Sequence, residues 1–358
     1  MKILFVSESD RFNDGCGQML LTGSELRSRG HEVLFALPGT GTAGRRIAAA
    51  GFPVRDLRIR HDYDLLRALK LRALCALERP DLIHAHHPRA HAVCLLAKSL
   101  GASAPLVVTR RIIFRIRRNP FSLLKYRSRR IARFIAVCAA AKNELVKAGV
   151  PERRVEILPS AVDMGLYDAP RQAREALRFA PPFRIGIIGH HAWHKGHEVL
   201  LEAARPILER FPGTVFVFAG RDTEKLRRKA AVLGLNASVE ILGERADVPE
   251  LLAGLHLFAM PSIQQGLPYA LIEAQAAGVP AVAAGVGGIL DVLLNEETGL
   301  VVPPQDSGKL AEAVIRVLSD ETLARRLAAN GLERIQREFS VSVVTDRLEA
   351  LYQAVLRP

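Results

Sequence analysis

The sequence predicts an α/β protein with two parallel-sheet domains, and three observations support this prediction. The chain has 358 residues, which is enough for two domains. Its first half alternates apolar and helical segments, starting with a strand at 2–7, a helix at 18–29 and a strand at 32–37. A second series of the same kind begins at 183–189. Strands and helices that alternate in this rhythm indicate parallel sheets, which bind ligands at the carboxyl ends of their strands.

The remaining elements continue the alternation. The first half is expected to contain helices at 65–77 and 139–148 and strands at 82–86, 105–109 and 133–138. Residues 170–182 are polar and bounded by prolines, so they are predicted to connect the two domains. The second half is expected to contain strands at 215–219, 238–242, 257–260 and 280–284, followed by helices at 306–318, 322–339 and 343–356.

The composition is that of an ordinary globular protein, with 49% hydrophobic and 24% charged residues. No apolar run approaches the roughly 20 residues that span a bilayer. The start of the chain is too short and, with Glu8, too soon acidic for a signal peptide. The cysteines follow no metal or disulfide spacing; they are Cys16, Cys75, Cys94 and Cys138. A cytoplasmic setting is therefore expected.

The net charge of +13 indicates an anionic partner. The segment Arg110–Arg133 interleaves large apolar side chains with basic ones, namely Arg110, Arg111, Arg115, Arg117, Arg118, Lys125, Arg127, Arg129, Arg130 and Arg133. This mixture suits a membrane surface that carries anionic lipid; a solvated helical face followed by a loop would show the same pattern. No nucleic-acid partner is expected, because a recognition motif is lacking and only 6% of the residues are aromatic.

Two glycine-containing turns lie close together between residues 261 and 288. The first, at Gly266-Leu267, precedes a helix that carries Glu273 near its start, where backbone N–H groups and the helix dipole favour an anion. The second, at Gly287-Gly288, follows the strand at 280–284. Two such turns side by side suit a phosphate-bearing ligand. Taken alone, Glu273 would also fit a carboxylate that only stabilises the helix N-terminus.

The stretch 261–288 resembles the signature of glycosyltransferase family 4, which contains retaining enzymes of the GT-B fold that use nucleotide sugars. The resemblance implies two doubly wound Rossmann-like domains that face each other across a cleft. It places an acceptor-binding domain at 1–169, a linker at 170–182 and a donor-binding domain at 183–342, with a C-terminal helix at 343–358 that packs back on the first domain. The likeness is strong over 183–304 and looser in the first half, where acceptors bind.

The resemblance also assigns roles in the second domain. The family has one Glu before the turn glycine, which contacts the donor sugar, and a second Glu that contacts the ribose; these positions are Gln265 and Glu273 here. The family's Gly-Arg…Lys-Gly pattern grips the donor diphosphate, and Gly189, Lys195 and Gly196 match it while His190 replaces the Arg. The resemblance also makes Arg221, near the family's nucleobase pocket, a candidate donor contact.

In the first domain the family has a glycine loop that faces the donor phosphates and the acceptor, here Gly15 and Gly17. These glycines do not form a dinucleotide fingerprint, because Leu20 occupies its last position. The family's His-x-His motif implies a substrate contact for His86. Arg111 replaces a histidine that many relatives have beside the reacting sugar.

Arg111 cannot act as a base, but it can hold a phosphate or a carboxylate. It could alternatively be a surface arginine of the basic segment. The histidines at 84–91 and 190–197 could suggest a metal, but no cysteine or carboxylate accompanies the first group at ligand spacing, and polar contacts around a diphosphate are preferred for the second. We expect no metal and no cofactor, with the nucleotide sugar as a substrate.

The predicted function is a metal-independent retaining glycosyltransferase. It would move a hexose-type sugar from a nucleotide-diphosphate donor to a membrane-associated glycan or glycolipid, such as lipopolysaccharide or another cell-envelope polysaccharide. It would work as a peripheral protein on the inner face of the cytoplasmic membrane. The alternative is a catalytically impaired GT-B scaffold that binds a nucleotide or an anionic lipid, because Arg111, His190 and Gln265 all depart from the family pattern.

Overall fold

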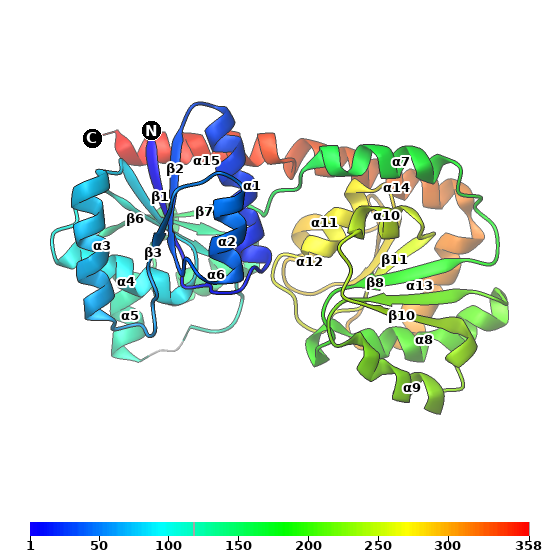
Figure 1. Cartoon of the computed structure of the whole chain (residues 1–358). Helices are drawn as coiled ribbons and strands as arrows, with labels where there is room; N and C mark the ends of the chain where they lie inside the picture. Colours follow the sequence, from blue (N-terminus) through cyan, green and yellow to red (C-terminus); the bar gives the residue numbers. More distant parts are fainter. Residues whose placement is uncertain (117–118, 358) are drawn as a thin grey trace. The chain divides into compact units, whose positions relative to one another are not determined.

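The computed structural model describes residues 1–116 and 119–357 (Figure 1). Arg117 and Arg118 of the basic segment and Pro358 of the predicted C-terminal element lie outside the described residues. By its contacts the chain divides into two units, Met1–Ala161 with Val341–Pro358 (unit 1) and Val162–Ser340 (unit 2). Each unit is built on one parallel sheet, which confirms the predicted fold class of two Rossmann-like domains.

The sheet of unit 1 has its strands in the order β3-β2-β1-β4-β5-β6-β7, with parallel pairing throughout. The strands are β1 (Lys2–Val6), β2 (Glu32–Leu37), β3 (Val54–Asp56), β4 (Leu82–Ala85), β5 (Leu106–Arg110), β6 (Ile131–Ala136) and β7 (Val155–Ile157). The order reverses between β1 and β4, so their carboxyl ends flank the switch point at which doubly wound sheets bind ligands.

The helices of unit 1 cover both faces of this sheet (Figure 1). They are α1 (Asp14–Ser28), α2 (Thr42–Ala49), α3 (Leu65–Glu78), α4 (Pro88–Ser99), α5 (Pro120–Arg127), α6 (Ala139–Lys147), the 3-10 helix η1 (Glu152–Arg154) and α15 (Val341–Leu356). The prediction that α1 begins at residue 18 is wrong, because the Asn13 side chain accepts a hydrogen bond from Cys16 N and starts the helix earlier. Gly15 and Gly17 therefore lie in the first turn of α1.

The last helix, α15, packs on α1, from the other end of the chain. Arg29, at the C-terminal end of α1, donates to the carboxylates of Asp346 and Glu349 at 2.5 and 2.9 Å, and Glu349 also lies 2.7 Å from His31 Nε2. Leu348 and Tyr352 of α15 are buried in the same apolar core as Phe5 and Phe35. Unit 1 is therefore stabilised in part by a helix that follows unit 2 in the sequence.

The sheet of unit 2 has the order β10-β9-β8-β11-β12-β13 and is also parallel. Its strands are β8 (Arg184–Ile188), β9 (Val215–Ala219), β10 (Val239–Gly243), β11 (Leu257–Met260), β12 (Ala281–Ala284) and β13 (Leu300–Val302). With β8 as the first strand this is the doubly wound order 3-2-1-4-5-6, whose switch point lies between β8 and β11.

The helices of unit 2 pack on both faces of its sheet. They are η2 (Met164–Tyr167), α7 (Asp168–Glu175), η3 (Trp193–Lys195), α8 (His197–Arg210), η4 (Thr223–Lys225), α9 (Leu226–Val232), η5 (Asn236–Ser238), α10 (Val248–Ala253), α11 (Tyr269–Ala276), α12 (Ile289–Val292), α13 (Ser307–Ser319) and α14 (Glu321–Glu338). No helix among the described residues combines the length and the apolar character needed to cross a membrane.

The contact boundary at residues 161–162 precedes the predicted boundary at residue 169. Tyr167 is buried in the core of unit 2, and Arg171 of α7 donates to Ala276 O at 3.0 Å. Residues 170–175 of the segment predicted as a linker are therefore helical and pack on unit 2, where Arg171 and Arg174 donate to main-chain carbonyls.

Candidate active site

Most of the predicted donor-binding residues of unit 2 follow the carboxyl ends of its strands. Gly189, His190 and Lys195 follow β8, and Arg221 follows β9. Gln265, Gly266 and Leu267 follow β11, and Gly287 and Gly288 follow β12. Because all these strands are parallel, the four loops emerge at one edge of the sheet, around its switch point.

The loops after β8 and β11 are bonded to each other. His194 O accepts hydrogen bonds from Ile263 N at 2.8 Å and from Gln264 N at 3.2 Å. Gly196 has φ +73°, and a Cβ added to it would lie 1.9 Å from Pro261 O. Only glycine fits a left-handed backbone this close to another main chain, so Gly196 allows the two loops to pack together into one site.

Lys195 and Gln265 meet in this site, since Lys195 Nζ donates to Gln265 Oε1 at 2.9 Å. The amide oxygen orients the ammonium group without neutralising its charge. The main chain of Gln265 also links the two glycine turns, because its carbonyl accepts from Gly288 N at 3.2 Å. The Gly288 amide is thus used inside the protein, although the sequence suggested it as a donor contact.

Glu273 lies in the second turn of α11, which begins at Tyr269 rather than at the Gly266 turn. Its Oε1 accepts a hydrogen bond from Tyr167 OH at 3.0 Å. Burial and the neighbouring Glu273 raise the pKa of Tyr167, so the phenol stays a donor at neutral pH. Sequence reasoning missed Tyr167, because it lies 106 residues from Glu273 and no spacing pattern connects them.

The other candidates in unit 2 differ in exposure. Arg221 has a side chain that is 62% exposed and lies 3.7 Å from Asp222, so a donor contact for it stays a prediction. Burial lowers the pKa of His197 to about 3, and its Nε2 lies 3.3 Å from Gly189 O. Burial also lowers the pKa of His194. These imidazoles are neutral near pH 7 and contribute polar contacts rather than charge.

In unit 1 the candidates lie at the corresponding edge, after β1, β4 and β5. His87, the N-cap of α4, has an unusual φ of +147°, and its Nδ1 lies 2.9 Å from Ser7 Oγ. A Cβ added to Gly15 would lie 2.6 Å from His87 Nε2. His87 therefore reaches the first turn of α1, and it is the histidine in contact with the predicted glycine loop. A strained non-glycine residue is a signal that only the structure reveals.

His84 and His86 are more deeply buried in unit 1 than His87 is. His84 is 2.6 Å from both Tyr352 OH and Thr109 Oγ1, and burial lowers its pKa to about 3. Its ring lies 3.9 Å from that of His86. His86 is 2% exposed, and neither ring nitrogen has a hydrogen-bond partner among the described residues. The substrate contact predicted for His86 stays a prediction, and the side chain is covered in this structure.

Arg111 is a partly buried cation and not a solvated surface arginine. Its Nη1 donates to Ser160 Oγ at 3.2 Å, and its buried Nε has no partner within residues 1–116 and 119–357. Burial lowers the pKa of Arg111 to about 10, so it remains protonated at neutral pH. Burial, followed by repulsion from the charge of Arg111, lowers the pKa of both His84 and His87. A cation among neutral imidazoles attracts an anionic group.

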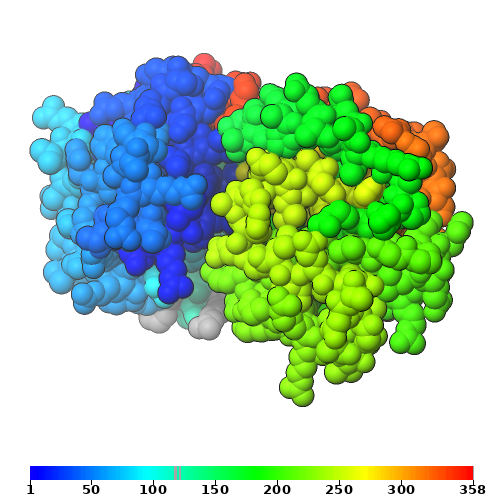
Figure 2. Space-filling model, turned by 45° about the vertical axis from the view of Figure 1, so that its right-hand side comes forward, coloured from blue at the N-terminus to red at the C-terminus, as the bar shows by residue number. Residues whose placement is uncertain are grey.

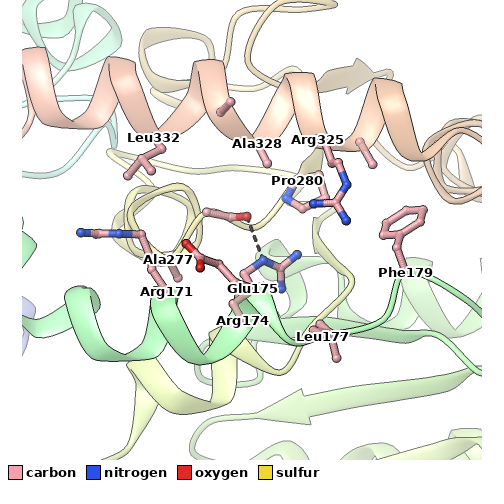
Figure 3. Close-up of a pocket in the computed structure, with 13 residues that line it drawn as sticks. Arg171, Arg174, Glu175, Leu177, Phe179, Ala277, Pro280, Arg325, Ala328 and Leu332 are labelled. Atoms are coloured by element: carbon pink, nitrogen blue, oxygen red, sulfur yellow. Dashed lines mark hydrogen bonds between the residues drawn. The ribbon is translucent and has the colours of Figure 1, made fainter.

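Neither histidine group is arranged around a metal, since no three His, Cys, Asp or Glu side chains of the described part of the chain are placed to hold one. A separate pocket of about 360 Å³ lies among α7, the end of α11 and α14 (Figure 3). There Arg174 Nε donates to Gly278 O at 2.9 Å, and Arg174 Nη1 donates to Ala253 O at 3.1 Å. Arg174 thus ties three segments together, and the residues around this pocket include none of the predicted site residues.

Two doubly wound units, with a lysine and two glycine turns at the switch point of the second, have the architecture of the GT-B class. Residues 169–334 match the family model for Glycosyl transferases group 1, and residues 19–166 match that for Glycosyltransferase Family 4. The chain belongs to glycosyltransferase family 4.

Similar proteins include two bacterial transferases. The chain is 24% identical over 318 residues to the capsular polysaccharide biosynthesis glycosyltransferase CapM of Staphylococcus aureus. The matched region covers 82% of this chain and 82% of CapM. It is 26% identical over 240 residues to the lipopolysaccharide core biosynthesis mannosyltransferase LpsB of Rhizobium meliloti. This matched region covers 63% of this chain and 68% of LpsB. The structure of HepE from Anabaena in complex with UDP has a TM-score of 0.85 at 23% identity, covering 99% of this chain and 100% of HepE. HepE has also been solved with UDP-glucose.

Proposed function

We propose that this protein is a retaining glycosyltransferase that moves a hexose-type sugar from a nucleotide-diphosphate donor to a membrane-associated glycan or glycolipid. The observation that carries the proposal is the bonded pair of Lys195 and Gln265 beside two glycine turns at the switch point of unit 2. The names of CapM and LpsB support an envelope glycan such as lipopolysaccharide as the acceptor. The UDP and UDP-glucose complexes of HepE support a nucleotide sugar as the donor.

In this proposal the donor site works by electrostatics. Lys195 and the amides of the Gly266 turn stabilise the departing diphosphate, which removes the need for a metal. Glu273, oriented by Tyr167, accepts hydrogen bonds from the ribose hydroxyls, and Gln265 contacts the donor sugar.

At the corresponding edge of unit 1, Arg111 holds an anionic group of a substrate. A guanidinium group pairs with the two oxygens of a carboxylate or phosphate, and the Arg111 Nε lacks such an acceptor among the described residues. The neutral His87 beside it supplies a further polar contact.

A basic and apolar surface of unit 1 would hold the protein on anionic membrane. Leu124 on α5 is exposed, as are Leu65 and Leu66 on α3. Lys125 Nζ joins the two helices, because it bonds to Asp62 Oδ2, just before α3, at 3.1 Å. Figure 2 shows the segment around α3, coloured between blue and cyan, at the outer surface of this unit. This surface supports the proposed peripheral binding to the inner face of the cytoplasmic membrane.

The test is a panel of nucleoside diphosphates and their sugar conjugates, with and without magnesium. Binding can be followed by the fluorescence of Trp193, the only tryptophan, which precedes Lys195 by two residues. We expect one diphosphate to bind without metal and to gain affinity from one attached sugar, and Lys195→Ala to weaken binding about 10-fold or more. Lys309→Ala, which removes an exposed lysine of the same unit, is the matched control.

An assay of sugar transfer from that donor to an envelope glycolipid distinguishes an active enzyme from the alternative, a catalytically impaired scaffold. The scaffold would bind the diphosphate without turnover. An unchanged affinity in Lys195→Ala would contradict the proposed site.

A further inference from the structure

The amino-terminal edge of the sheet in unit 1 brings two basic turns together. Arg129 and Arg130 precede β6, and Arg153 and Arg154 precede β7. β6 and β7 are adjacent and parallel, with Phe134 opposite Val155. Parallel neighbours begin at the same edge of a sheet, so the two turns lie side by side. This edge is opposite the one that carries Arg111 and His87.

A pocket of about 460 Å³ lies between these turns. It is lined by Arg127, Arg129, Gly149, Pro151, Arg153 and Arg154. None of the described residues that line it is acidic. Four arginines thus converge from α5, η1 and the turn before β6.

Two of these arginines are fixed by main-chain carbonyls instead of carboxylates. Arg154 Nη2 donates to Ser128 O at 3.0 Å and also to Ile131 O, and Arg127 Nε donates to Ala148 O at 2.9 Å. Carbonyl partners hold the guanidinium groups in position but leave their full charge in place. The cations are therefore preorganised before any ligand binds.

The positive charge of the pocket is not balanced by the carboxylate that lies between two of its lining residues in the sequence. Glu152 lies between Pro151 and Arg153 in the chain, but it pairs with Lys142 Nζ at 2.8 Å. Burial, followed by repulsion from Arg133 and Arg153, lowers the pKa of Arg154. Holding like charges together is unfavourable unless a counter-charge binds between them.

We propose that this pocket binds the phosphate group of an anionic ligand, at a site separate from the donor site of unit 2. Guanidinium groups match phosphate oxygens in pairs, and a compact phosphate can accept from several arginines at once. The ligand is either the phosphate headgroup of a lipid or a soluble phosphate compound. Leu124 is exposed on α5, one turn before Arg127, so the helix that supplies one pocket arginine also presents an apolar side chain, as a lipid would require.

The test removes two charges without disturbing the fold. Arg129 and Arg153 are exposed, and neither side chain forms a hydrogen bond or ion pair within the described part of the chain, so Arg129→Gln/Arg153→Gln should fold normally. The matched control, Arg45→Gln/Arg79→Gln, removes two exposed arginines of the same unit that lie outside the pocket.

Two probes distinguish the sources of phosphate. Inorganic pyrophosphate is titrated calorimetrically in a Lys195→Ala background, which weakens the proposed diphosphate site of unit 2. Phosphatidylcholine vesicles with and without phosphatidylglycerol are used in flotation. We expect the pocket variant to bind one of the two probes about 10- to 30-fold more weakly than the control variant does. A loss confined to vesicles identifies a lipid headgroup, and a loss confined to pyrophosphate identifies a soluble phosphate compound.

Equal binding by the pocket variant and its control in both arms would overturn the proposal. The result is independent of the proposed function, because nucleotide binding is assigned to unit 2. Measured by Trp193 fluorescence with Lys195 intact, it should be the same in the pocket variant and its control.

Discussion

Substitution of Gly196 by alanine tests whether the close approach of two loops builds the donor site. The backbone there has φ +73°, a conformation that costs a non-glycine residue about 1–2 kcal/mol. The added Cβ would also lie 1.9 Å from Pro261 O, whereas real Cβ contacts are almost never under 3.0 Å. The loop after β11 must therefore move by about 1 Å, which adds about 1–3 kcal/mol of overpacking.

Gly234 is the matched control, because its φ is +70° and a Cβ added there would meet nothing within 4 Å. Gly234→Ala should therefore lower the free energy of unfolding only by the cost of the left-handed backbone conformation. We expect Gly196→Ala to shift the urea midpoint further than Gly234→Ala does. It should also reduce the transfer rate up to about 100-fold, since a 1 Å displacement separates Lys195 from Gln265. Equal stability and equal diphosphate affinity in the two variants would refute the reasoning.

Three further predictions concern single side chains. Tyr167→Phe removes the hydrogen bond that orients Glu273, so diphosphate-sugar affinity should fall about 3- to 10-fold in a fluorescence titration; an unchanged affinity would contradict that role. Gln265→Glu places a carboxylate on Lys195, so affinity for the free diphosphate should fall, and a rise would show that the lysine charge is not what binds it. Glu349→Gln should lower the free energy of unfolding by up to about 1 kcal/mol at neutral pH. Hydrogen bonds from His31 and Arg29 lower the pKa of this carboxyl in the folded state, so its contribution is present above the unfolded value of 4.5 and is lost as the pH falls through the folded value. The wild type and Glu349→Gln should therefore converge in stability on acidification.

Strands that are short apolar runs between turn residues were predictable from the sequence. The strands at 215–219 and 257–260 have the predicted bounds because their side chains are nearly all buried and because a glycine follows the first and a proline follows the second. The strand β3 was missed, since Val54-Arg55-Asp56 lies at the sheet edge and only Val54 is apolar. Local apolar pattern does not reveal an exposed edge strand.

The site was predictable in its residue types but not in its contacts. The spacing of the glycines located Lys195 and Gln265 in separate loops, but their hydrogen bond spans 70 residues and depends on the strand order. Tyr167 and His87 were not assigned roles, because one acts from a segment predicted to precede the linker and the other through an unusual backbone conformation. Such contacts are properties of the assembled sheet.

The position of α15 has a consequence for how the protein is made. Tyr352 lies 2.6 Å from His84 Nδ1 and fills the core of unit 1, yet the ribosome adds it after all of unit 2. A nascent chain therefore carries an incomplete unit 1, with an open apolar surface on α1, while Val162–Ser340 is synthesised and can fold as one continuous segment. Unit 2 can be complete first, and the core around His84 is finished only when the last helix leaves the ribosome.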